Sequence, residues 1–571
     1  MIDLILRDGW VVDGTGAPRQ RNDVGIQDGR IVAIGRIDDS ARRTIDLDGL
    51  VVAPGFVDPH THYDAQIMWD PAVTPSSVHG VTTVLGGNCG FTIAPMEPQH
   101  GDYLIPMLAR VEGMPPHALA AGLDLEWKSF GSWLDRLDGN VAVNAGFLCG
   151  HSALRRLVMG QGAVGEQATP EQLGAMVALL HESLADGALG FSSSMGQAHN
   201  DHNGDPVPSR FATREEMLTL CSALTDHEGT WIEFIPSIER MFTDPERELM
   251  ADMSAAAGGR ALNWNLLGVH PDADGQQSRE NKLGSSDIAR ERGGHVVALT
   301  LPDPMTMRLS FATGFLWDTL PGWKEIMHAP PGEKERLLAN AGVRRRLLEG
   351  ARQAGPRTYT DWANSIVSDV GDPTLSRYVD RRVGSIAAER GVDPFDAMLD
   401  IVVEDRLRTG IEPPLGGDDD ESWAERIEIF RDPRTLVGGS DAGAHLDMMK
   451  TFAGTTRFLA NAVRDRGFLE LEEAINLVTD APARFFGLRD RGRIAEGWWA
   501  DICVFDPDTI DRGPIEMRDD LPAGAERLTA DAEGIANVFV NGVEIVRGND
   551  LTGATPGTVL RSGRDTETVI G

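Results

Sequence analysis

The sequence has 571 residues, of which 41% are hydrophobic and 25% are charged, as expected for a globular protein with a packed core. Its 53 basic and 87 acidic residues give a formal net charge of −34. A field of this sign repels polyanions, so nucleic acid and anionic membranes are not expected as partners.

Four cysteines in so long a chain do not form a disulfide framework, which points to a reducing compartment. The first residues lack the pattern of a secretion signal, and no apolar run approaches the roughly 20 residues that a membrane span needs. We therefore expect a cytoplasmic protein. The subunit count stays open, with a homo-oligomer retained as one option.

The two ends of the chain are rich in short β-type runs separated by turns. Near the carboxyl end, Asn541-Gly542 lies between two such runs, which is a strong hairpin signal. Residues 1–54 and 490–571 are therefore predicted to form one small β-sandwich.

Residues 55–489 alternate between short apolar runs and helical patterns, which is typical of parallel βα units. The number of runs matches the eight strands of a (β/α)₈ TIM-type barrel. The predicted strands are 52–58, 81–86, 141–147, 188–193, 230–235, 261–267, 295–301 and 435–439. Residues 303–356 interrupt this rhythm and are predicted to form a helical insertion above the barrel mouth that could act as a lid.

The first predicted barrel strand ends in His60 and His62. Side chains at i and i+2 of a strand share a face, and the carboxyl ends of barrel strands form the active-site mouth. Paired imidazoles at that position suit a divalent transition metal such as zinc. The alternative is a pair of polar histidines in a loop.

Two further residues follow barrel strands. Cys89 comes directly after the second strand, where its thiolate could bind metal or its side chain could pack as a small hydrophobe. Asp441 follows the last strand and can hold water, accept its proton and return that proton to a leaving nitrogen. Its alternative role is that of a helix cap.

Together these motifs resemble the D-aminoacylase (N-acyl-D-amino-acid deacylase) branch of the amidohydrolase superfamily. The resemblance includes Gly-Asn-Cys-Gly around Cys89 and Gly-Ser-Asp ending at Asp441, and it extends over nearly the whole chain. It implies a distorted barrel and hydrolysis of a C–N amide bond in a small acylated substrate by metal-activated water.

The family pattern also has a histidine on the fifth strand, another on the sixth, and a lysine that holds the substrate carboxylate. Here Glu233 is the polar residue of the fifth strand, and Asn263 and Asn265 occupy the sixth. No lysine occurs between Lys128 and Lys282, so a bridging carboxylated lysine is excluded there. We therefore predict one firmly bound metal, most simply zinc, held by His60, His62 and Asp441 with Cys89 as a candidate fourth ligand, and a doubtful second site.

Four other residues are candidates for contact with the substrate or with the metal ligands: His151, Glu233, Asn265 and His270. The leading interpretation is an amidohydrolase of N-acyl amino acids or related amides, with a small molecule as its partner. A deaminase or lyase using one metal on the same scaffold, or a catalytically inactive relative, are the alternatives.

Overall fold

The computed structural model describes residues 1–97, 101–314 and 316–571. Eight parallel strands form the barrel, in two sheets with the orders β6-β7-β8 and β9-β10-β11-β12-β13-β18, which follow the order of the chain. They are β6 (Phe56–Asp58), β7 (Val81–Gly86), β8 (Asn144–Phe147) continuing as β9 (Cys149–Gly150), β10 (Gly190–Ser194), β11 (Trp231–Ile235), β12 (Ala261–Trp264), β13 (His295–Thr300) and β18 (Thr435–Val437). The predicted barrel is confirmed.

The ring closes between β18 and β6 just beyond the ends of these strands. The Asp441 amide donates to the His60 carbonyl at 3.0 Å, and the His62 amide donates to the Ala442 carbonyl at 2.7 Å. The barrel is therefore closed by the loops after β6 and β18, which carry the predicted metal ligands His60, His62 and Asp441.

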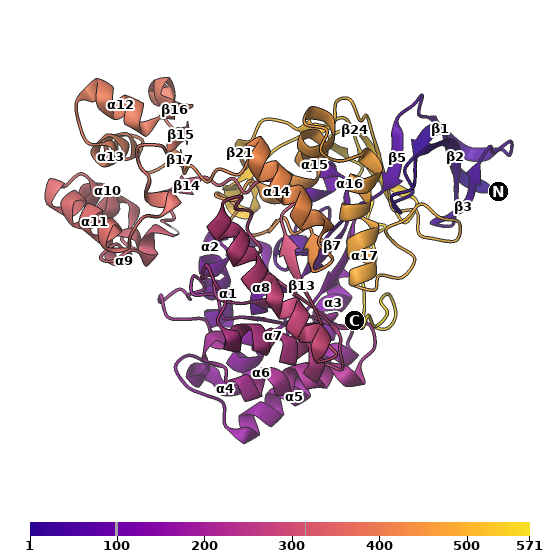
Figure 1. Ribbon diagram of the computed structural model, residues 1–571, viewed down its shortest axis with the longest axis horizontal. Coiled ribbons are helices and arrows are strands. Elements are labelled where there is room, and N and C mark those ends of the chain that lie inside the picture. The colour runs from indigo at the N-terminus through magenta and orange to yellow at the C-terminus, as the bar shows by residue number, and fades with distance from the viewer. Residues whose placement is uncertain (98–100, 315) are drawn as a thin grey trace.

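Helices cover the outside of the ring (Figure 1). The parallel strands are therefore buried on both faces. On α5, Thr169 caps the first turn and Pro170 occupies the first helical position, where no amide hydrogen is needed. These helices are α1 (Gly101–Val111), α2 (Pro116–Gly122), α3 (Phe130–Leu137), α4 (His151–Met159), α5 (Pro170–Ala185), α6 (Arg214–Ala223), α7 (Asp244–Ala256), α8 (Ala273–Glu291), α14 (Asp420–Arg431), α15 (Gly454–Phe458), α16 (Leu471–Val478) and α17 (Asp480–Phe485).

Strands from both ends of the chain share one nine-stranded sheet, in the order β26-β25-β24-β19-β5-β1-β2-β3 with β4 paired to β1. Its members are β1 (Ile2–Val11), β2 (Gln20–Gln27), β3 (Arg30–Gly35), β4 (Ala41–Asp46), β5 (Val51–Pro54), β19 (Ile502–Phe505), β24 (Ile535–Val540), β25 (Val543–Arg547) and β26 (Asp550–Leu551). Because β19 pairs with both β5 and β24, strands from the two ends of the chain lie in one sheet.

The segment between β13 and β18 projects from one side of the barrel and has its own hydrophobic cluster (Figure 1). It contains α9 (Lys324–Met327), α10 (Pro331–Leu338), α11 (Ala341–Gln353), α12 (Val383–Arg390) and α13 (Pro394–Glu404), with β14 (Leu309–Ser310), β15 (Ile366–Asp369), β16 (Arg381–Arg382) and β17 (Gly410–Glu412).

The expected insertion of residues 303–356 was too short and too uniformly helical. Leu309 of β14 pairs with Ile411 of β17, so the unit is completed by residues far beyond 356. Trp317 and Trp323 are buried inside this cluster, where Trp323 stacks on Trp362 with ring centroids 6.0 Å apart. They build the core of the insertion, so they do not line a pocket at the barrel mouth.

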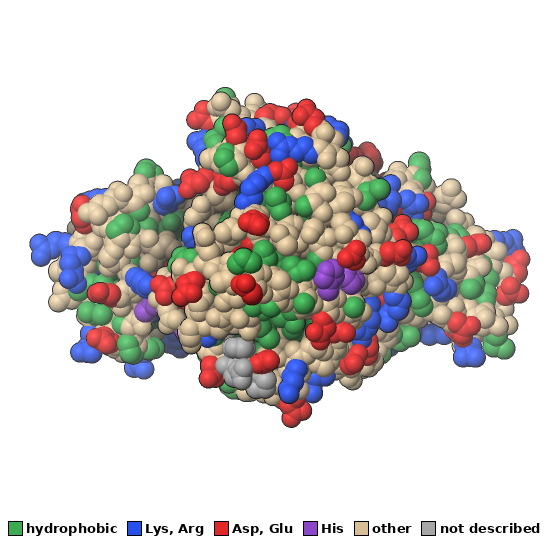
Figure 2. Space-filling model, turned by 90° about the horizontal axis from the view of Figure 1, so that it is seen from below, with side chains coloured by type: hydrophobic (Ala, Val, Ile, Leu, Met, Phe, Trp, Pro, Cys, Tyr) green, Lys and Arg blue, Asp and Glu red, His purple; other side chains and the backbone are tan. Residues whose placement is uncertain are grey.

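None of the described helices is long and apolar enough to cross a membrane. On the face seen in Figure 2, acidic and basic side chains lie interspersed over the surface.

Candidate functional site

The two histidines that follow β6 lie at the barrel mouth with their rings facing one region. His60 and His62 are 5% and 3% exposed, and their ring centroids are 5.2 Å apart in an edge-on arrangement. The Sγ atom of Cys89 lies 3.5 Å from His60 Nε2 and 3.8 Å from His62 Nε2. One ligand atom from each of these three side chains falls within 4.8 Å of the others, a spacing that can hold a metal ion.

Cys89 reaches this position through a short turn, Asn88–Gly90, directly after β7. Its backbone amide donates to Glu233 Oε2 at 2.7 Å, which ties the turn to β11. Burial, and then the charge of Glu233, raise the pKa of the Cys89 thiol well above its ordinary value. A cation at the site would have the opposite effect and favour the thiolate.

Asp441 completes the cluster from the loop after β18. Its Oδ1 lies 3.1 Å from His62 Nε2 and 3.5 Å from His60 Nε2. Burial alone would raise the pKa of Asp441, but the hydrogen bond and charge of His62, with the charge of His60, hold it below its usual range. The residue has a φ of 59°, in the left-handed region that Asp and Asn tolerate better than most side chains.

A second set of polar side chains contacts the Nδ1 atom of each imidazole. Glu112 Oε1 lies 3.3 Å from His62 Nδ1, and the Asn265 amide lies 2.7 Å from His60 Nδ1. The same amide is 2.7 Å from Glu233 Oε1. Partners of this kind fix the orientation of metal-binding imidazoles.

The pKa values of the two imidazoles are shifted in opposite directions. Burial and the nearby His62 lower the pKa of His60 to about 3. Burial would also lower that of His62, but Glu112 and Asp441 raise its pKa to about 10. Burial raises the pKa of Glu233 to about 8, although the Cys89 amide, the charge of His62 and the Asn265 side chain act in the opposite direction.

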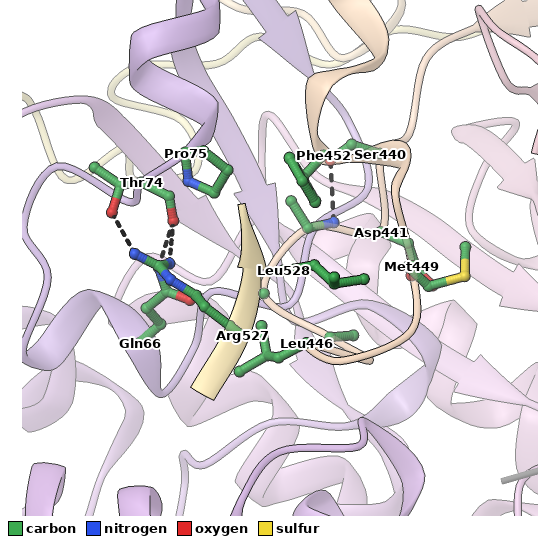
Figure 3. A pocket seen from close by; sticks show the side chains of 13 residues that line it. Gln66, Thr74, Pro75, Ser440, Asp441, Leu446, Met449, Phe452, Arg527 and Leu528 are labelled. Atoms are coloured by element: carbon green, nitrogen blue, oxygen red, sulfur yellow. Dashed lines mark hydrogen bonds between the residues drawn. The ribbon is translucent and has the colours of Figure 1, made fainter. Parts of the chain in front are cut away.

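The loop that carries Asp441 is supported from behind by the carboxyl-terminal strand β22 (Ala525–Thr529) (Figure 3). The Leu528 amide donates to the Leu446 carbonyl at 2.7 Å. The Ser440 side chain accepts from the Ala442 amide at 3.0 Å and also bonds Asp58, at the end of β6. The loop is thus fastened to both the barrel and the carboxyl-terminal strands.

A cavity of about 210 Å³ opens beside the cluster. His199 and His445 also line it, and His199 Nδ1 lies 2.7 Å from the Ser194 hydroxyl. Their positions in the sequence are weak indications: His445 lies shortly after Asp441, and His199 lies in a polar loop after the fourth strand. No sequence pattern indicates a site role for Glu112, because in the sequence it follows a helix and not a barrel strand.

Two predicted site residues lie elsewhere. His151 is buried on α4, where its ring bonds Ser193 and Glu216 at 2.8 Å each, while Arg155 pairs with the same Glu216. His270 is exposed in the loop before α8 and does not line the cavity. Substrate contact by these two is not supported, since a buried ion pair occupies one and solvent surrounds the other.

Comparisons with known proteins agree with this geometry. A model of the amidohydrolase family matches residues 43–302 and 339–546. The chain belongs to the amidohydrolase family. It is a hydrolase of C–N amide bonds that uses a divalent metal, and its substrate is a small molecule.

Three relatives are informative. The chain is 29% identical to a D-aminoacylase of Alcaligenes xylosoxydans xylosoxydans, over 98% of this chain and 97% of that protein. It is similar to the crystal structure of N-acyl-D-glutamate deacylase from Bordetella bronchiseptica with zinc and a phosphonate inhibitor, with 26% identity, a TM-score of 0.65, and 98% and 100% of the two chains covered. A D-aminoacylase structure described by one-metal activation and second-metal attenuation at a binuclear centre matches with the same identity, TM-score and coverage.

Proposed function

We propose that this chain hydrolyses N-acylated small molecules with one firmly held metal, bound by His60, His62 and Asp441 with Cys89 as the fourth ligand. The convergence of these side chains carries the proposal, since their ligand atoms come from three separate strand ends. The amide class follows from the family, whereas the ligand set and the roles below are inferred from the geometry.

The donor set fits zinc. Two imidazoles, a thiolate and a carboxylate are the ligands that Zn²⁺ prefers, whereas Mg²⁺ and Ca²⁺ prefer oxygen. Such an ion, when bound, would polarise the substrate carbonyl and lower the pKa of water toward neutrality.

Asp441 is the group placed to move the proton. Its carboxylate has a lowered pKa, so it is ionised and able to accept a proton from the attacking water. Returned to the amide nitrogen, the same proton allows the amine to leave. The seam between the His60 carbonyl and the Asp441 amide keeps this carboxylate in place during both transfers.

Asn265 and Glu233 position the cluster. In the structure the Asn265 amide nitrogen lies 2.7 Å from both His60 Nδ1 and Glu233 Oε1. When His60 binds metal through Nε2, its Nδ1 carries the hydrogen, so the Asn265 amide would turn its oxygen to that position. A protonated Glu233, in keeping with its raised pKa, would then donate to the same oxygen. The residues that stand where the family pattern has two imidazoles therefore bond to each other and to the Cys89 amide, which supports one firm metal site.

Metal content and hydrolysis of purified protein test this proposal together. We expect about one zinc ion per chain after dialysis, and primary-amine release from a panel of N-acyl amino acids and simple N-acylamines. His62→Gln should lose both metal and activity, whereas the exposed His270→Gln serves as the matched control and should retain both. Two tightly held ions per chain would overturn the single-site assignment, and full activity of His62→Gln would overturn the ligand set.

The predictions of a cytoplasmic location and of a homo-oligomer stay predictions.

A further inference from the structure

Acidic and apolar side chains both line the cavity beside the cluster. Glu112 and Asp441 are the acidic members, and Glu233 bonds the lining residues Cys89 and Asn265. The apolar part of the lining consists of aliphatic and thioether side chains. These are Ile235, Leu266, Leu299, Leu301, Met305 and Met449. Among the described residues that line this cavity, none is a lysine or an arginine.

Two arginines adjacent to lining segments have their guanidinium groups engaged within the protein. Arg210, below the His199 loop, donates to the carbonyls of Gln197 and His199 and to the Asn200 side chain, at 3.0 to 3.3 Å. Arg110 precedes the lining residue Val111 and forms an ion pair with Asp318. Hydrogen bonds to neutral oxygens thus hold the Arg210 guanidinium, and an ion pair with a carboxylate holds that of Arg110.

A larger cleft of about 790 Å³ shares His445 with this cavity, and it offers no better receptor for an anion. Arg308 on its wall is bound by both oxygens of Asp369 at 2.7 Å. Asp369, Asp447 and Glu526 stand on the same wall, so acidic groups balance the arginines among its described lining residues.

We propose that this site selects uncharged N-acyl compounds with an apolar group beside the scissile bond and discriminates against substrates that carry a carboxylate there. This inference rests on the proposed amidohydrolase function and narrows its substrate class. A substrate carboxylate would lose its hydration in this cavity and would find no lysine or arginine among the described lining residues to replace it. An apolar substituent, by contrast, would bury its surface against the aliphatic wall.

A matched pair of substrates tests the selectivity. N-acetylleucine, in both enantiomers, is compared with N-acetyl-3-methylbutylamine, which is the same molecule without its carboxylate. Both release acetate and a primary amine, so one fluorogenic amine assay serves for both. We expect kcat/KM of the zinc-loaded enzyme to be at least about 10-fold higher for the uncharged compound, because the leucine carboxylate would be desolvated without a lysine or arginine to pair with it. A higher kcat/KM for either enantiomer of N-acetylleucine overturns the proposal.

Two variants then test whether the selectivity arises because no lysine or arginine is present among the described lining residues. Met305 is only partly buried on the apolar wall, so Met305→Lys can keep its alkyl stem there and bring an ammonium to the cavity. Met305→Leu is the uncharged control. We expect Met305→Lys to shift the kcat/KM ratio toward N-acetylleucine by about 10-fold, and Met305→Leu to leave it unchanged. Equal ratios in both variants would count against the proposal.

Binding separates a failure of this inference from a failure of the proposed function. If neither compound is cleaved, the amidohydrolase assignment fails for this substrate pair, and calorimetry on the zinc-loaded Asp441→Asn variant measures affinity directly. Tighter binding of the uncharged compound would still support the selectivity. Equal or tighter binding of N-acetylleucine would overturn it.

Discussion

Replacement of Asp441 by asparagine removes the proton acceptor while preserving its surroundings. The residue has a φ of 59°, which asparagine adopts readily, and its backbone amide still donates to the His60 carbonyl. Three other candidate ligands, His60, His62 and Cys89, remain in place. Because an amide cannot accept the proton, Asp441→Asn should lower kcat by about 10²- to 10⁴-fold, equivalent to about 3 to 5 kcal/mol of barrier.

The assay is steady-state hydrolysis of the best substrate found, with zinc content measured on the same preparations. Asp447→Asn is the matched control, because Asp447 follows in the same loop but lines the neighbouring cleft. It should retain most of the activity. If Asp441→Asn hydrolyses the substrate as fast as the wild-type enzyme, Asp441 is not the proton acceptor and the mechanism is wrong. A variant that loses its zinc as well as its activity would show that Asp441 acts chiefly as a ligand.

Three further predictions concern the support of the site and of the fold. Glu112→Gln should weaken zinc affinity by about 10- to 100-fold in a chelator competition, because Glu112 orients His62; an affinity equal to that of wild type would refute this role. Trp323→Ala should destabilise the insertion by about 3 to 5 kcal/mol in denaturant unfolding, whereas Trp10→Ala, at a site 37% exposed, should cost far less; similar losses would contradict the assigned core. Burial alone would raise the pKa of Glu544, but hydrogen bonds from Arg547, Arg43 and Asn537 lower it to about 2. Its stabilising contribution is therefore present above pH about 4.5 and is lost as the pH falls toward 2. The urea midpoint of Glu544→Gln should accordingly lie below that of wild type at pH 7 and approach it at pH 3, and an equal gap at both values would refute the linkage.

Much of the barrel could be predicted because its signals are local. Each strand is a short apolar run bounded by turns, and the spacing of His60 and His62 places both side chains on one face of whatever strand precedes them. The position of Asp441 after the last strand follows from the same rule, since carboxyl ends of parallel strands meet at one rim.

The partners of these residues could not be predicted in this way. Glu112, the residue after α1, approaches His62 where its carbonyl accepts from the His445 amide, and Asn265 reaches His60 only because the ring closes around both. The insertion was underestimated for a related reason: its strands β14 and β17 are separated by about a hundred residues, and no local pattern pairs them.

The sequence by itself determined the strands, the ring they form and the residues that stand at its rim, because periodicity and strand direction act over a few residues. Tertiary structure decided which side chains orient the imidazoles, which histidines are drawn into the cavity and where its walls are apolar. Those features depend on packing between distant segments, where burial and charge are set by neighbours that the local sequence does not name.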